Sequence, residues 1–318
     1  MQISIPETAE FIKNSDNIYI LSHQSPDGDT LGSAFALWNV LKSMGKKANI
    51  YNSDGFPKRY DFLYEGYYEQ DFEPQTIISV DVADEKLLGS ALEQYKGRIN
   101  LCIDHHISNT DFAERTLLNS NASAACEVLF ALFKFMNISL DKITAECLYV
   151  GMATDTGCFK YENTAIDTHI AAAVLMKYGI DYAGINRKMF DVKSKARIKV
   201  EQYLYSNIEY ALDDKCAFVV ITQDIVDKSG IESSEFEGLA SMTLQAEGVE
   251  VGMTIKEKDE NTYKISMRSA NDIDVSALCQ QFGGGGHIKA AGCSMNGTLD
   301  EVREKLIDAI QKAIEEKK

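Results

Sequence analysis

The stretch NIYILSHQSPDGDTLGSAFALWNVLKSM, residues 17–44, decides the fold. Its first seven residues form a short apolar run, which predicts a buried strand. From about residue 30 to 44, apolar side chains recur at helical spacing, and these are Leu31, Phe35, Trp38 and Leu41. A strand followed directly by an amphipathic helix is typical of the start of a parallel α/β unit.

Two more short β-rich runs follow, TIISVD at residues 76–81 and INLCIDHH at residues 99–106. SAACEVLFALFKF and ITAECLYVGMATD then have helical spacing. Strands that alternate with helices predict an α/β fold with a doubly wound, mostly parallel sheet. In such sheets ligands bind beyond the carboxyl ends of the strands, and all three runs end in polar residues. The runs therefore favour one shared site, although polar residues also mark the ends of ordinary strands.

The second half of the chain has a different pattern. The segment RKMFDVKSKARIK, residues 187–199, holds six Lys or Arg and one Asp, a local charge of +5. We interpret residues 186–209 as a helical linker with a solvated basic face, and attraction of a phosphate is the alternative. From residue 210 onward, KCAFVVIT, VEVGMTIKE and TYKISMRS predict strands, and the chain closes with a helix. The expected domains are residues 1–185 and a smaller α/β domain, residues 210–318.

Composition narrows the possible function classes. The 318 residues carry a formal charge of −16, which argues against a long nucleic-acid track because phosphate backbones require a dominant basic surface. A small phosphorylated ligand held by a few local cations is compatible with this charge. No apolar run approaches the roughly 18 residues of a membrane span. The N-terminus lacks a charged-then-apolar signal pattern, so we expect a cytoplasmic protein without a membrane partner.

The polar segment HQSPDGD places His23, Asp27 and Asp29 within seven residues, between a strand and a helix. Carboxylates together with imidazoles suit Mn²⁺ or Zn²⁺. Asp29 could instead cap the helix, and Asp-Gly is a common turn. This segment alone leaves a metal site and an ordinary helix start as alternatives.

Further potential ligands stand at the other strand ends. Asp81 ends one run, and Asp104, His105 and His106 end the next. The chain has only five histidines, and three of them lie at these strand ends, with His23 as the third. Separate structural roles for each histidine do not explain this distribution, which favours a common site.

Asp155 lies at the end of a predicted helix, where Gly157 favours a C-terminal turn. A carboxylate is unfavourable there because of the helix dipole, so a compensating cation is expected. With the four aspartates named above, it makes five carboxylates beside histidines. So many carboxylates could not all stay ionised without cations. The pattern predicts a two-metal site suited to phosphoester hydrolysis.

The stretch FGGGGHIKAAG, residues 282–292, has four consecutive glycines followed by His287. It is not a Walker loop, since no Lys-Ser or Lys-Thr follows, and it lacks the third glycine of the dinucleotide fingerprint. Glycines let backbone N–H groups approach an anion closely, and His287 would add a donor or a cation. We interpret the stretch as a phosphate-contacting loop.

The motifs HQSPDGD, SVDVAD, CIDHH, TDTG, MRS and GGGGHIKAAG span nearly the whole chain. In this order they resemble the DHH phosphoesterases that have a DHH-associated C-terminal domain, and most of all the type that acts as nanoRNase and pAp phosphatase. Related single-strand exonucleases carry further domains, for which 318 residues leave no room. Type II inorganic pyrophosphatases share the N-terminal motifs but not the last two.

The resemblance implies a role for each motif residue. It implies two Mn²⁺ ions, with Mg²⁺ or Co²⁺ as substitutes, held by His23, Asp27, Asp29, Asp81, His105 and Asp155. Asp81 would be shared, with His23 and Asp27 on one ion and the other three residues on the second. Asp104 would orient a neighbouring histidine, and His106 would face the scissile phosphate. The implied substrate contacts are Arg268, Ser269, Gly284, Gly285, Gly286 and His287.

The resemblance also implies the reaction, which is hydrolysis of RNA of about two to five nucleotides and of adenosine 3′,5′-bisphosphate (pAp). Hydrolysis of cyclic di-AMP or of its linear product pApA is an alternative, because these activities share every motif. A non-catalytic nucleotide sensor is an alternative of another class, which the complete set of candidate ligands disfavours. The expected partners are short RNA, dinucleotides and pAp, with a homodimer as an open possibility.

Overall fold

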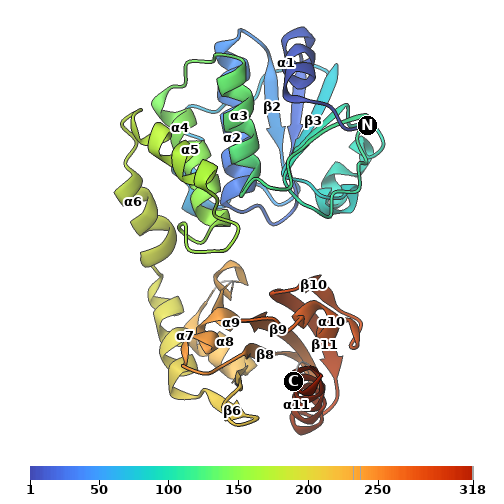
Figure 1. The fold of residues 1–318 in the computed structure, drawn as a ribbon, viewed down its shortest axis with the longest axis vertical. Helices are drawn as coiled ribbons and strands as arrows, with labels where there is room; N and C mark the ends of the chain where they lie inside the picture. The colour runs from blue at the N-terminus through green and yellow to red at the C-terminus, as the bar shows by residue number, and fades with distance from the viewer. Residues whose placement is uncertain (232, 237, 317–318) are drawn as a thin grey trace. The chain divides into compact units, whose positions relative to one another are not determined.

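The computed structural model describes residues 1–231, 233–236 and 238–316. The chain divides into two compact units, Met1–Val192 and Lys193–Lys318 (Figure 1). The division falls inside the segment that we predicted as a linker. No helix within the described ranges is long and apolar enough to cross a membrane.

The first unit is built on a five-stranded parallel sheet of order β2-β1-β3-β4-β5. Its strands are β1 (Ile18–Leu21), β2 (Ala48–Tyr51), β3 (Thr76–Val80), β4 (Leu101–Asp104) and β5 (Arg115–Leu118). The predicted parallel α/β fold is confirmed. We did not predict β2 and β5, because their sequences, ANIY and RTLL, are short and mix polar with apolar residues.

Alternate residues of these strands point to opposite faces of the sheet and enter two separate cores. Ile18 and Ile20 lie in the larger core, whereas Tyr19 and Leu21 lie in the smaller one. The larger core is closed by helices α1 (Ile5–Asn14), α2 (Gly28–Ser43), α3 (Ala125–Phe135), α4 (Lys142–Asp155) and α5 (Ile166–Met176), with a 3₁₀ turn at Lys58–Leu63 (Figure 1). The smaller core is closed by the 3₁₀ turns Glu85–Leu88 and Ser90–Tyr95. The second face of the sheet is therefore covered without α-helices.

The predicted linker is helical over most of its length. A short helix α6 (Tyr182–Asn186) runs into a π-helical turn at Arg187–Asp191, and α7 (Lys195–Ser206) begins four residues later. Half of the six basic residues in this stretch form ion pairs. Lys188 pairs with Asp61 at 2.9 Å, and Lys193 and Arg197 pair with Glu201 at 2.7 and 2.8 Å. Because these pairs neutralise half of the cations, they favour the solvated face over attraction of a phosphate.

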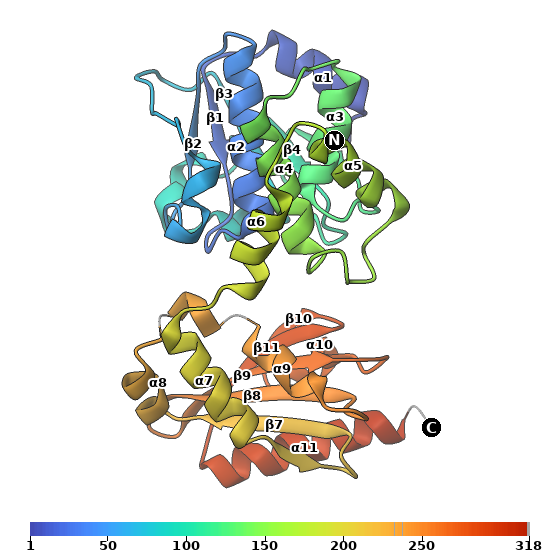
Figure 2. The same cartoon turned by 90° about the vertical axis from the view of Figure 1, so that its left-hand side faces the viewer.

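The second unit has a six-stranded mixed sheet of order β10-β11-β9-β8-β7-β6, in which β7 and β8 are parallel and the other pairs antiparallel. Its strands are β6 (Glu209–Ala211), β7 (Cys216–Ile221), β8 (Val251–Asp259), β9 (Thr262–Ser269), β10 (Gly285–His287) and β11 (Ala290–Asn296). Figure 2 shows α7 on one face of this sheet and α11 (Leu299–Glu315) on the other. Next to α7 lie α8 (Gln223–Ser229), α9 (Leu239–Met242) and the 3₁₀ turns Ser233–Phe236 and Thr243–Gln245, and next to α11 lies α10 (Val275–Gln280).

Candidate metal centre and phosphate-binding face

The predicted metal ligands lie together at the carboxyl edge of the sheet in the first unit. They are His23, Asp27, Asp29, Asp81, His105 and Asp155. Three of them follow strands β1, β3 and β4, as expected where parallel strands end at one edge. The other three are brought in by helices, because α2 begins at this edge and α4 ends there.

The two aspartates at the start of α2 have different surroundings. Asp27 is the N-cap of the helix, and its carboxylate accepts hydrogen bonds from the backbone N–H groups of Asp29 and Thr30, both at 3.0 Å. The alternative in which Asp29 caps this helix is therefore wrong. Asp29 is fully buried, and its carboxylate oxygens accept hydrogen bonds from the N–H groups of Ala125 and Cys126 at 2.6 and 2.9 Å. The N-terminus of α3 thus holds the Asp29 carboxylate.

Close helix packing brings Asp29 and Asp155 to one place. Gly151 of α4 passes Asp29 so closely that a Cβ at Gly151 would lie 2.5 Å from Asp29 Oδ1 and would overlap Cys126 Sγ. Because glycine has no Cβ, α4 can pack here against both α2 and α3. Asp155, one helical turn further along α4, then reaches the same cluster.

Among the residues that the structure describes, three groups of side chains have ligand atoms within 4.8 Å of one another. They are His23 with Asp27 and Asp81, then Asp29 with His105 and Asp155, and finally Asp81 with His105 and His106. His105 Nε2 lies 3.3 Å from Asp155 Oδ2 and 3.6 Å from Asp81 Oδ1. On its other side, Asp81 Oδ2 lies 3.6 Å from His23 Nε2. Asp81 therefore lies between the two histidines, as a shared ligand would.

Hydrogen bonds set the tautomers of these histidines. His23 Nδ1 lies 2.6 Å from the carbonyl oxygen of Gln24, and His105 Nδ1 lies 3.3 Å from that of Ala122. A carbonyl oxygen can only accept, so each Nδ1 donates, and the neutral ring presents the Nε2 lone pair to the cluster. This is the form of histidine that binds a metal ion.

Two buried polar atoms lie at the centre of the cluster. His105 Nε2 and Asp81 Oδ1 have no hydrogen-bond partner within the described part of the chain. Burying a polar atom without a partner is costly, and a cation between the two would satisfy both. Imidazole and carboxylate donors together suit a divalent metal such as Mn²⁺ or Zn²⁺. The residues of this centre therefore fit a metal ion.

The charges of the cluster shift its pKa values. Burial and the charges of Asp81 and Asp155 raise the pKa of Asp29 well above its ordinary value. Burial, with Asp27 and Asp81, also raises the pKa of Asp155 to about 6, against the opposing effect of its histidine partner. Although burial opposes charging of the ring, Asp81 and Asp27 raise the pKa of His23 to about 9. The raised pKa values favour retention of protons in the absence of a cation, and divalent cations would take the place of those protons.

Asp104 orients the second histidine of the CIDHH motif. It is fully buried, and its Oδ1 accepts hydrogen bonds from the backbone N–H of His105 and from His106 Nδ1, both at 2.8 Å. Its Oδ2 accepts from Asn109 Nδ2 at 2.6 Å. The His106 ring is thus held by Nδ1, with 30% of its side chain exposed and Nε2 directed away from Asp104.

Thr30 and Asn109 were missed by our reasoning from the sequence. Thr30 is fully buried, and its hydroxyl donates to Asp81 Oδ2 at 2.7 Å and contacts His23 Nε2. Its position three residues after the N-cap places it on the ligand side of the first helical turn, and this spacing could have revealed it. Asn109 gives no comparable signal, because its contact with Asp104 depends on the fold of the loop after β4.

In the second unit, Arg268 and His287 lie in one row across the sheet. His287 of β10 pairs with Ala290 of β11, and Ala290 pairs with Arg268 of β9. Directly paired residues in antiparallel strands point to the same face, so Arg268 and His287 share a face. Ser269 is buried on the opposite face, where its hydroxyl donates to the carbonyl oxygen of Asn271 at 3.2 Å.

The four glycines of FGGGGH differ in their surroundings. The last two form the strand β10 with the histidine, so the predicted loop is partly a strand. A Cβ on Gly284 would overlap the carbonyl oxygen of Gly292, and a Cβ on Gly286 would lie 2.5 Å from that of Ala290. The close approach of the β11 backbone therefore requires these two glycines. A Cβ on Gly285 would meet no atom within 4 Å, which leaves space beside this residue for a ligand.

Comparison with known proteins agrees with this division of the chain. Residues 17–152 match the DHH family, N-terminal domain, and residues 213–316 match the DHHA1 domain. The chain is 27% identical to the bifunctional oligoribonuclease and PAP phosphatase NrnA of Thermus thermophilus, over 96% of this chain and 93% of that protein. It is 25% identical to NrnA of Bacillus subtilis, over 92% and 93%. It is also 25% identical to the cyclic-di-AMP phosphodiesterase GdpP of Geobacillus thermodenitrificans, over 95% of this chain but 48% of GdpP.

Solved structures give the same result for the fold. An exopolyphosphatase-related protein from Bacteroides fragilis superposes with a TM-score of 0.88 at 28% identity, over 97% of this chain and 95% of that one. RecJ from Thermus thermophilus, at 12% identity, shares the fold with a TM-score of 0.57 over 96% and 55%. The sequence motifs, the two matched domains and these likenesses agree, and the chain belongs to the DHH family, with a DHHA1 domain as its second unit.

Proposed function

We propose that this protein is a metal-dependent phosphoesterase that hydrolyses short oligoribonucleotides to mononucleotides and dephosphorylates pAp to AMP. The observation that carries the proposal is the centre around Asp81, where buried carboxylate and imidazole atoms need a cation at the strand ends of a DHH domain. The NrnA relatives, which match nearly the whole chain, are named for this pair of activities.

Two Mn²⁺ ions are the proposed cofactors, and Mg²⁺ or Co²⁺ could substitute for them. One ion would be held by His23, Asp27 and Asp81, and the other by Asp29, Asp81, His105 and Asp155. When bound, such ions supply Lewis acidity that activates water and neutralises charge on phosphoryl oxygens. The ligand side chains are held in place by the protein itself. The backbone amides at the start of α3 hold the Asp29 carboxylate, and two backbone carbonyls fix the tautomers of His23 and His105.

His106 is the residue to which we assign direct contact with the scissile phosphate. Although burial opposes charging, the hydrogen bond to Asp104 and the charges of Asp81 and Asp104 raise the pKa of His106. In its protonated form the ring carries a proton on Nε2 as well as on Nδ1, and Nε2 can then donate to a phosphoryl oxygen. Such a donor stabilises negative charge that grows in the transition state. Asp104 acts as a positioning residue that keeps the ring in place.

The second unit would bind a phosphate group of the substrate through Arg268 and His287. A guanidinium group can bind phosphate in a bidentate manner, and Gly285, in the neighbouring row of the same face, leaves space for a ligand. Gly284 and Gly286 would contribute by shaping β10. Ser269 stays a predicted contact, and its hydroxyl would first have to leave Asn271. A cytoplasmic location and a homodimer also stay predictions.

Hydrolysis of cyclic di-AMP or pApA is a second candidate function. The likeness to GdpP favours it, although the chain spans about half of that relative. A turnover assay with pAp, pApA, cyclic di-AMP and RNA from dimer to pentamer, each with Mn²⁺, separates the candidates through the ratio of kcat/KM values.

We expect RNA dimers to pentamers and pAp to be the better substrates, and an Asp104→Asn variant to lose most turnover of every substrate. Higher kcat/KM for cyclic di-AMP or pApA would replace the proposal with the second candidate. Tight binding without turnover of any of these compounds would identify a nucleotide sensor.

A further inference from the structure

One face of the second sheet is left open over its β9, β11 and β10 strands. Its residues, taken from the pairing register, are Arg268, Ser266 and Lys264 of β9, Ala290, Gly292 and Ser294 of β11, and Gly285 and His287 of β10. We call these eight residues the open face. All eight are exposed or half-buried, whereas residues that alternate with them on β9 and β11, such as Ile265, Met267 and Cys293, enter the core beneath.

The open face carries positive charge at both ends and small side chains between them. Arg268 and His287 mark one end, and Lys264 marks the other. None of the eight residues is Asp or Glu, although the chain has 48 of these. In so acidic a protein, a face without carboxylates and with cations at both ends suits an anionic ligand.

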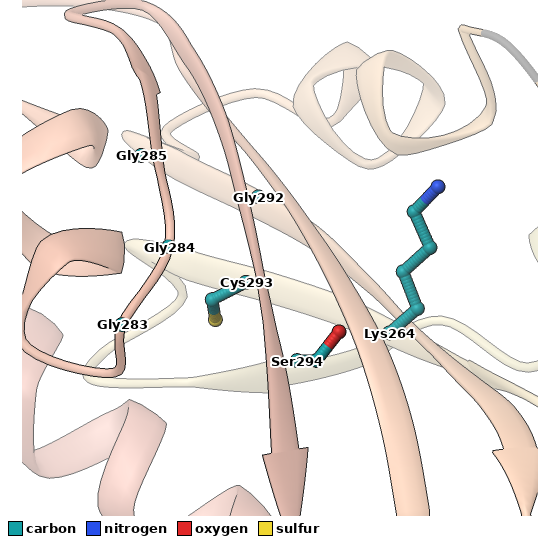
Figure 3. A pocket seen from close by; sticks show the side chains of 7 residues that line it. All are labelled: Lys264, Gly283, Gly284, Gly285, Gly292, Cys293 and Ser294. Atoms are coloured by element: carbon teal, nitrogen blue, oxygen red, sulfur yellow. The ribbon is translucent and has the colours of Figure 1, made fainter. Parts of the chain in front are cut away.

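A depression of about 430 Å³ lies at the Lys264 end of this face. It is lined by Lys264, Gly283, Gly284, Gly285, Gly292, Cys293 and Ser294. Figure 3 shows the Lys264 side chain extending from β9, with the Ser294 hydroxyl near its base and the Cys293 thiol turned away. Lys264 and Ser294 are direct partners in the register of β9 and β11, so a cation and a hydroxyl donor stand side by side.

The charge of the Lys264 ammonium is not balanced by an ion pair among the described residues. No described carboxylate forms an ion pair with it, and its register partner on β8 is another lysine, Lys256. Lys256 lies over the ring of Phe236, with Nζ 3.5 Å from the ring centroid. Burial and the charge of Lys264 lower the pKa of Lys256. Like charges that face each other across strands are unfavourable, and a bound anion would relieve their repulsion.

Lys264 lies too far from Arg268 to serve the same phosphate group. The two residues are four positions apart on one strand, which places their Cα atoms about 13 Å apart at the usual rise per residue. Side chains on a strand stand roughly perpendicular to the sheet, so we do not expect these two to converge on one group. The open face therefore offers two separate anion positions with a floor of small residues between them.

We propose that Lys264 and Ser294 form a second phosphate subsite, which binds a phosphodiester of an oligonucleotide whose other end is held at Arg268 and His287. This inference rests on the proposed function and explains how the protein would distinguish substrates by length. A pAp molecule carries both phosphates on one ribose and reaches one position. An oligonucleotide spans both, so the subsite favours oligonucleotides over pAp.

The test compares Lys264→Gln with Lys305→Gln, a control at an exposed lysine of α11 on the other side of the sheet. The full chain is held in EDTA, and a labelled pentaribonucleotide is titrated at several salt concentrations by fluorescence anisotropy. We expect Lys264→Gln to weaken binding about tenfold and to reduce the salt slope by about 0.7, the value for one phosphate contact with a single strand. Ser294→Ala should weaken binding less, and Lys305→Gln should match the wild type.

With Mn²⁺ present, the ratio of kcat/KM for the pentamer to that for pAp should fall about tenfold in Lys264→Gln. The melting temperature should stay the same or rise, since a like-charge contact is removed. An equal loss for both substrates, or an unchanged salt slope, would overturn the subsite. If the wild type turns over neither compound, the proposed function fails, and the anisotropy experiment still decides the subsite.

Discussion

The candidate metal centre of the first unit and the open face of the second unit differ in burial, charge and hydrogen bonding. The candidate metal centre is acidic, with Asp29 and Asp81 buried and the other four ligands half-buried, and hydrogen bonds hold several of its side chains in place. The open face is exposed or half-buried and cationic, and its floor is made of small residues. A bond-breaking site needs atoms held in place before the substrate arrives, whereas a face that accepts substrates of several lengths needs spaced charges and little steric detail.

Removal of metal ions should give the largest difference between the two regions, because it should affect the metal centre and not the open face. EDTA should abolish turnover, and Mn²⁺ at about 100 times its Kd should raise the free energy of unfolding by about 2.7 kcal/mol through linkage. Oligonucleotide binding by the second unit should survive EDTA. Thermal unfolding and anisotropy, with and without Mn²⁺, check both statements. Turnover that persists in EDTA would contradict the metal centre.

The next largest effect is expected for Asp81, which lies between the two histidines. Asp81→Asn should lower kcat on the order of 10³-fold, because the proposed shared ligand is removed from both ions. The control is Asp84→Asn, three residues further on, where Asn can still cap the turn at Glu85–Leu88. Similar kcat values for the two variants would disprove the role of Asp81.

A smaller effect is expected in the glycine run, where neighbouring residues should behave differently. Gly285→Val should raise KM about tenfold without changing the melting temperature or Mn²⁺ binding, because its side chain would occupy ligand space. Gly284→Val should destabilise the fold by about 1–3 kcal/mol, since its side chain would meet the β11 backbone. Equal melting temperatures for the two variants would show that the surroundings of these glycines are misassigned.

The smallest expected effect is on stability, and it concerns Lys193 and Arg197, whose charges Glu201 neutralises. Burial opposes ionisation of Glu201, but Lys193 and Arg197 lower its pKa below the ordinary 4.5. The stability that this pair provides is therefore present above pH 4.5 and is lost as the pH falls through the lowered value. Glu201→Gln should cost about 1–2 kcal/mol at pH 7, a modest figure because Lys193 is 41% exposed.

Denaturant unfolding of Glu201→Gln and the wild type at pH 7 and pH 3 measures this contribution. The difference between the two proteins should shrink at pH 3. A difference that is independent of pH would mean that the lost contact is packing and not charge.

The sequence predicted that these histidines and aspartates would lie together, because each of them gives a local signal. Histidines and aspartates follow short apolar runs, and parallel strands place the ends of such runs together. The identity of the N-cap was harder, since Asp27 and Asp29 both suit that position, and only contact with α3 distinguishes them.

The second unit was less predictable because its features depend on strand register. Arg268 and Ser269 are adjacent in a recognisable motif, yet they point to opposite faces. Lys264 belongs to no motif, and it became a candidate only through its pairing with Ser294 and Lys256. Register comes from contacts between distant segments, which no local pattern in a single sequence contains.

The contact between Gly151 and Asp29 has a consequence for judging distant relatives of this chain. A relative could keep every histidine and aspartate of the centre and still carry alanine at the position of Gly151. The added methyl group would press on the Asp29 carboxylate and on Cys126, so α4 would have to shift and carry Asp155 with it. Active and inactive relatives would then differ at a residue that binds neither metal nor substrate. The packing of α4 against α2 and α3 at this position is therefore as informative as the ligands themselves.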